Sequence, residues 1–131
     1  MLPWLHGYSV AATSPEPKMA ISPARYDIVV QRRADYEFEV EFEDSNGSPI
    51  NLTGWQIIAQ VWNPGRTQKI GDFVVTVVNA VLGRVKFRIP FSVTILLPFE
   101  SHYDVMLINP SLLREYYLEG LVQASEGYTS P

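Results

Sequence analysis

The chain has 131 residues, of which 47% are hydrophobic and 18% are charged, and its formal net charge is -4. That length suits one domain, and the composition is that of a folded globular protein rather than a disordered chain. The acidic balance argues against a nucleic-acid partner, and the absence of cysteine excludes disulfides and thiolate metal sites. No apolar run approaches the roughly 20 residues that span a bilayer, so no membrane partner is expected.

The first 25 residues differ in composition from the rest of the chain. Prolines recur through them, and because proline fixes φ and lacks an amide donor, we expect this stretch to be extended. It also carries large apolar side chains that a solvated tail would not need, namely Trp4, Leu5, Tyr8, Met19 and Ile21. We therefore predict an interaction arm over residues 1–25 that packs on a neighbouring subunit, with a disordered terminus as the alternative. Residues 126–131 are expected to form a short C-terminal tail.

From Tyr26 onward the sequence changes to short runs of alternating polarity that are separated by turn residues. These runs predict strands over 27–33, 36–43, 55–62, 72–78, 84–89, 103–108 and 115–123, with one helical turn within 92–99. The residues with turn or corner chemistry are Asn46, Gly47, Gly54 and Gly83. Seven strands at about ten-residue spacing predict an all-β sandwich or barrel over residues 26–125. The complementary charges of the second and fifth strands favour a seven-stranded immunoglobulin-like β-sandwich, because those two strands are neighbours in that topology.

Two of these strands carry complementary charges on their outward faces. Residues 36–43 alternate without interruption, so apolar side chains face inward and glutamates outward, while residues 84–89 present bases outward. We predict that the two strands pair antiparallel, each acid–base pair contributing about 0.2–1 kcal/mol. The residues concerned are Glu37, Glu39, Glu41, Arg84, Lys86 and Arg88. The alternative, that the glutamates bind Ca²⁺, is disfavoured because alternating residues on a flat strand do not surround an ion.

The strands predicted at 55–62, 103–108 and 115–123 are apolar on both faces. Whichever face packs on the core, large side chains remain on the other, and a contiguous apolar patch marks a contact surface. The predicted interface residues on these strands are Ile58, Trp62, Met106, Ile108, Tyr117 and Leu121. Either the arm or a loop of the same chain, or an arm from a neighbour, could cover this patch.

The sequence offers no pattern of residues for catalysis, for a cofactor or for a metal. Nucleophile elbows, phosphate-binding loops, dinucleotide fingerprints and metal-ligand spacings are all missing. Ser101, His102 and Asp104 lie close together, but on a strand they are expected to form an exposed polar row rather than a catalytic group. An alternative site is a carbohydrate platform, made of Trp62, Tyr116 and Tyr117.

Five short motifs follow one another along the chain: DSNGSPINLTGW at 44–55, GRVKF at 83–87, TILLP at 94–98, YDVML at 103–107 and LEGLV at 118–122. In the same order, they resemble the segments DSDGSPIDLTGY (a hairpin and corner), GTVTL, TAALP, YDLEL and LEGTVTV of small virion domains of tailed phages. Among these domains is the N-terminal immunoglobulin-like domain of upper-baseplate proteins that carry receptor-binding proteins. The resemblance covers 27–125 and leaves out the arm. Within that range this sequence departs from the family's pattern at 99–102 and 109–113.

The resemblance implies a virion structural protein that forms a homo-oligomer or is present in several copies, and that assembles with other proteins of the particle, from the tail, baseplate, fibre or capsid. The leading expectation is a tail- or baseplate-associated adaptor that anchors fibres or receptor-binding proteins through its arm and the apolar sheet face. Two alternatives stay open: a decoration protein that cements the capsid, and a carbohydrate-binding module that touches the host surface. None of the three is expected to be an enzyme.

Overall fold

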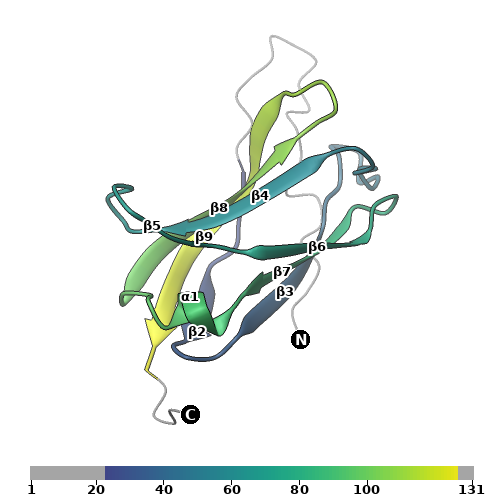
Figure 1. The fold of residues 1–131 in the computed structure, drawn as a ribbon. Helices are drawn as coiled ribbons and strands as arrows, with labels where there is room; N and C mark the ends of the chain where they lie inside the picture. The colour runs from purple at the N-terminus through teal and green to yellow at the C-terminus, as the bar shows by residue number, and fades with distance from the viewer. Residues whose placement is uncertain (1–22, 127–131) are drawn as a thin grey trace.

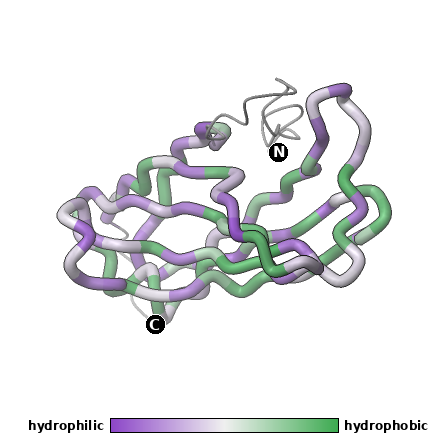
Figure 2. Tube along the Cα trace, turned by 90° about the horizontal axis from the view of Figure 1, so that it is seen from above, coloured by the Kyte–Doolittle hydropathy of each residue, from purple (hydrophilic) through white to green (hydrophobic). Residues whose placement is uncertain are grey.

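The computed structural model of the chain describes residues 23–126 and shows an all-β fold in which two sheets pack face to face (Figure 1). Hydrophobic and hydrophilic residues follow one another along the strands (Figure 2), so each strand can bury one face. The elements are β1 (Ala24–Arg25), β2 (Ile28–Gln31), β3 (Tyr36–Glu41), β4 (Gln56–Trp62), β5 (Lys69–Asp72), β6 (Val74–Asn79), β7 (Arg84–Ile89), α1 (Phe91–Thr94), β8 (Glu100–Ile108) and β9 (Arg114–Ser125).

The larger sheet has the order β1-β9-β8-β4-β5, with β2 also paired to β9, and the smaller sheet has the order β3-β7-β6. The core lies between them and draws aromatic rings from both. The ring of Phe38 in β3 lies 6.0 Å from that of Tyr103 in β8, and Phe42 lies 6.1 Å from Tyr117 of β9. These edge-to-face contacts add to the burial of apolar surface that holds the two sheets together.

The described residues form nine strands rather than the seven predicted, because two short strands, β1 and β5, precede the runs predicted at 27–33 and 72–78. β1 and β2 pair in succession with β9, in parallel, and are separated at Tyr26 and Asp27. β5 and β6 are separated at Phe73, whose amide donates a hydrogen bond to the carbonyl of Ala59. At Phe73 the chain leaves β4 in the larger sheet and joins β7 in the smaller one. An alternating sequence carries no signal for such a change of sheet, because its period is the same in both.

The ends of the sandwich differ slightly from the predicted boundaries. The sheet begins at Ala24, before the expected start at Tyr26, because β1 pairs with β9. Glu126, the first residue of the predicted tail, forms ion pairs with Arg32 and Arg33. The predicted interface residues of the arm, Trp4, Leu5, Tyr8, Met19 and Ile21, lie outside the described residues.

The predicted antiparallel pairing of the acidic and basic strands is present between β3 and β7. The register is Glu37 with Arg88, Glu39 with Lys86 and Glu41 with Arg84. Glu41 is largely buried, and its Oε2 lies 3.2 Å from Nε of Arg84. Arg88 forms its ion pair instead with Asp35, at 3.2 Å. The outer face of the smaller sheet therefore carries facing rows of opposite charge.

Three of the four predicted turn residues adopt left-handed backbone: Gly47 at φ 82°, Gly54 at φ 85° and Gly83 at φ 69°. Asn46 does not, and its amide instead donates a hydrogen bond of 2.9 Å to Oδ1 of Asp44. At Gly83 a Cβ atom would lie 2.7 Å from the carbonyl oxygen of Phe42, so only glycine fits this approach.

Candidate functional site

The predicted apolar face lies on the outer side of the larger sheet, across β4, β8 and β9. Ile58, Met106 and Tyr116 stand in register as one row, in which Ile58 and Tyr116 are exposed and Met106 is half-buried. Trp62 and Leu121 are half-buried and flank the exposed His102 in a second row. These two rows are the apolar part of what we call the outer face.

A charged row separates the two apolar rows. Gln60, Asp104 and Glu119 stand in register between them, and Nη2 of Arg66 reaches to within 3.9 Å of Oδ2 of Asp104. Partial burial raises the pKa of the Asp104 carboxyl; Arg66 opposes this rise and the charge of Glu119 adds to it. The outer face thus has two narrow apolar bands with a charged row between them, and it is not the contiguous apolar patch expected from the sequence.

Two predicted interface residues do not belong to the exposed surface. Tyr117 is buried and contacts the core, because a β-bulge shifts the register between β8 and β9 and turns both Tyr117 and Leu118 inward. Ile108 is also buried. It lies on the central strand of three, where its cross-strand partners Gln56 and Arg114 present long side chains on either side of it.

A polar cleft of about 190 Å³ opens at one end of the outer face. Trp62 lines it, and the indole Nε1 donates a hydrogen bond of 3.0 Å to Oε1 of Gln60, which fixes the ring. Two guanidinium–carboxylate pairs also line the cleft. They are Arg66 with Asp104, at 3.9 Å, and Arg25 with Glu119, at 3.7 Å.

A further set of exposed apolar side chains lies on the segment that links β7 to β8. Four side chains of this segment are between 46% and 72% exposed, and we call them the 91–99 surface: Phe91, Ile95, Leu96 and Phe99. A groove of about 420 Å³ adjoins them and is lined by Leu96, Pro98 and Ile70 among others. The sequence predicts one helical turn here, and α1 is that turn, but it does not predict the exposed apolar side.

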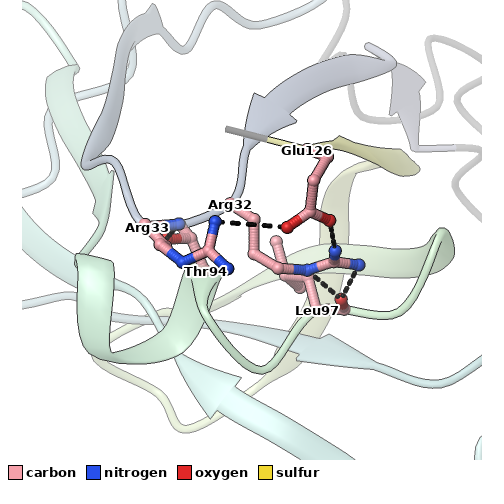
Figure 3. Close-up of polar contacts among 5 residues, drawn as sticks. All are labelled: Arg32, Arg33, Thr94, Leu97 and Glu126. Carbon is pink, nitrogen blue, oxygen red and sulfur yellow. Dashed lines mark hydrogen bonds and ion pairs between the residues drawn. The ribbon is translucent and has the colours of Figure 1, made fainter. Parts of the chain in front are cut away.

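The 91–99 surface is held in place through its backbone. The guanidinium of Arg32 donates two hydrogen bonds to the carbonyl of Leu97, at 3.0 Å from Nε and 2.7 Å from Nη2, and it is ion-paired with Glu126 (Figure 3). The amide of Arg33 donates to Oγ1 of Thr94 at 3.1 Å. These contacts use backbone atoms and the buried Thr94 hydroxyl, and they leave the four side chains of the 91–99 surface exposed.

Two further contacts fasten the ends of the segment. The amide of Phe91 donates a hydrogen bond of 2.6 Å to Oδ1 of Asp35, and the amide of Ala124 donates one of 3.0 Å to the carbonyl of Phe99. Within the segment Thr94 and Leu97 are buried. One sequence signal could have indicated the exposed side: six of its nine residues are large and apolar, more than a single turn can bury.

The expected polar row near the start of β8 is only partly exposed. His102 is exposed and Asp104 is half-buried, but Ser101 points into the core, and its Oγ has no hydrogen-bond partner within residues 23–126. In the same range no group of three or more His, Cys, Asp or Glu side chains could hold a metal ion. No helix in the described part of the chain is long and apolar enough to cross a membrane.

No protein-family model matches the sequence, and a search of curated proteins finds no significant match.

Proposed function

We propose that the chain is a non-enzymatic structural adaptor of a tailed-phage particle, associated with the tail or baseplate, which anchors fibres or receptor-binding proteins. Two observations support it: the ordered series of motifs that resembles small virion domains, and an all-β fold of two packed sheets. Counting β1 with β2, and β5 with β6, as single interrupted strands gives seven strands, which is the number of an immunoglobulin-like sandwich.

The observation that carries the proposal is the 91–99 surface. Exposed apolar clusters on a soluble domain mark protein–protein contacts, and large side chains at the centre of an interface contribute most of its affinity. The segment is already fastened by Arg32, Asp35 and the backbone of β9. A partner would therefore dock on an ordered surface, with little loss of conformational entropy on this side of the interface.

Particle incorporation tests the proposal directly. A tagged chain is expressed during infection by the phage that encodes it, and its copy number in purified particles is measured by mass spectrometry. Phe99→Ser combined with Leu96→Ser is expected to lower incorporation by about tenfold or more, because a hot-spot side chain contributes roughly 2 kcal/mol. Leu113→Ser is the matched control, since Leu113 is equally exposed but lies in the β8–β9 loop. Absence of the unaltered chain from particles, or normal incorporation of the double variant, would overturn the proposal.

The arm is the second part of the proposed docking mechanism. The core cluster of the described residues runs from Ala24 to Ala124, so a chain that lacks residues 1–22 keeps the whole cluster. We expect this truncated chain to unfold cooperatively like the full chain but to be lost from particles. Normal incorporation of the folded truncated chain would show that docking does not need the arm. The proposed docking mechanism would then rest on the 91–99 surface alone.

The polar cleft favours a second candidate function, a carbohydrate-binding module. A fixed indole beside carboxylates and guanidinium groups offers a stacking face together with acceptors and donors for sugar hydroxyls. Tyr117 is buried and has no place in this site. Binding on a glycan array that Trp62→Ala abolishes and Leu113→Ser retains would establish this function, and absence of binding by the unaltered chain would exclude it for the sugars on the array.

A further inference from the structure

The two sheets present four edges within residues 23–126, and three of them carry features that prevent pairing with another chain. The β1–β2 edge is interrupted and has the ion pair of Arg25 with Asp27, at 3.5 Å. The edge strand β3 carries the outward glutamates. The edge strand β5 has only four residues, and they include the ion pair of Lys69 with Asp72, at 3.2 Å. Charges, short length and interruptions are the usual protection of sheet edges.

β6 is the fourth edge, at the end of the smaller sheet, and it lacks this protection. Its sequence, VVTVVN, contains neither a charged residue nor a proline. Val74, Val77 and Val78 are between 46% and 50% exposed. A bulge lies only near its end, between Val77 and Asn79, so the run from Val74 to Val77 stays regular. An uncharged edge of β-branched residues is a template for a further strand.

We propose that two copies of this chain pair through β6, antiparallel and about a two-fold axis, and so join their smaller sheets into one. A two-fold contact requires a surface that complements itself. β6 meets this condition because valine and threonine would face valine and threonine on both sides of the joined sheet, and such β-branched pairs stabilise cross-strand contacts.

The charges of the smaller sheet are compatible with a second copy. In the joined sheet the order would be β3-β7-β6-β6-β7-β3, with uncharged strands at the centre and the acidic strands outermost. The two basic β7 strands would be separated by three strand spacings, about 14 Å, which exceeds the Debye length of about 8 Å at physiological ionic strength. Their bases also face the glutamates of their own β3.

The oligomeric state of the full chain tests this proposal. Sedimentation analysis over a wide concentration range is expected to show a monomer–dimer equilibrium that Val77→Lys weakens by about tenfold or more, because lysine on an edge strand opposes pairing. The matched control is Val29→Lys, on the exposed side of β2, which should leave the equilibrium unchanged. Urea unfolding of both variants verifies that they fold. A chain that remains monomeric, or a dimer that persists in folded Val77→Lys, overturns the proposal.

A cross-linking measurement locates the contact independently of any loss of stability. The chain has no cysteine, so a single introduced thiol can form a disulfide only between two copies. Val74→Cys and Thr76→Cys lie on one face of β6, and under mild oxidation at least one of them should form covalent dimers much faster than Val29→Cys. Equal rates at all three positions would contradict pairing through β6.

Discussion

Arg32→Ala should loosen the 91–99 surface and leave the packing of the hydrophobic core unchanged. Arg32 follows β2 directly, and its guanidinium donates both hydrogen bonds to the carbonyl of Leu97, at 3.0 and 2.7 Å, across 65 residues of sequence. Hydrogen bonds from a charged group contribute roughly 1.5–3 kcal/mol. The ion pair with Glu126, which is partly exposed, adds no more than about 1 kcal/mol. We therefore expect the free energy of unfolding to fall by about 2–3 kcal/mol.

Urea unfolding measures that change, and hydrogen exchange shows where it acts. The amides of Ile95, Leu96 and Leu97 donate hydrogen bonds within the segment, and their exchange should accelerate selectively in Arg32→Ala. Arg25→Ala is the control, because its ion pairs at 3.5 and 3.7 Å join half-exposed side chains and contribute only about 0–1 kcal/mol. The reasoning fails if Arg32→Ala costs no more than Arg25→Ala and leaves these amides protected.

Three further changes test the packing of the sandwich by urea unfolding. Gly120→Ala should destabilise the fold by about 3 kcal/mol or more, because the added Cβ would lie 2.0 Å from the carbonyl oxygen of Tyr26. A decrease in the free energy of unfolding of less than about 1 kcal/mol would contradict this close approach. Ser101→Ala should raise stability by about 1 kcal/mol, because it removes a buried hydroxyl without a described partner, and a lower stability would indicate that the hydroxyl is satisfied. Burial, with smaller effects of neighbouring groups, raises the pKa of Tyr36 and of Tyr117 to about 12, from 10.0. The unfolded chain therefore loses these protons first, so stability should fall as pH rises from 10 towards 12, and Tyr117→Phe should flatten that dependence.

The parts of the fold that follow from local pattern could be predicted from the sequence. Uninterrupted alternation in β3 and β7 fixes which side chains share a face, and opposite charges on those faces indicated their pairing. Gly47, Gly54 and Gly83 were recognisable because they flank alternating runs, and each adopts positive φ.

The parts that depend on distant contacts could not be predicted in this way. The bulge that buries Tyr117 inserts one residue into β9 relative to β8, which reverses the face of every residue beyond it, and nothing in the local pattern marks the position. The exposed side of the 91–99 surface depends on Arg32, a residue that reads as an ordinary strand-end charge in the sequence. Strand periodicity thus identified the outer face as a candidate and missed the 91–99 surface, on which the proposed function rests.

The two proposed contacts have a joint geometric consequence. Val74, at the start of β6, is the register partner of Arg88 near the end of β7, so the 91–99 surface lies beyond the Val74 end of β6. Antiparallel pairing places the Val74 end of one β6 beside the Asn79 end of the other. The 91–99 surfaces of a dimer would then lie at opposite ends of the joined sheet. Such a dimer would bind two partner molecules at once, and linked sites gain avidity without any new contact. If the dimer forms through β6, Val77→Lys should therefore weaken attachment to a multivalent particle even though the 91–99 surface is intact, whereas it should leave binding to a single isolated partner unchanged.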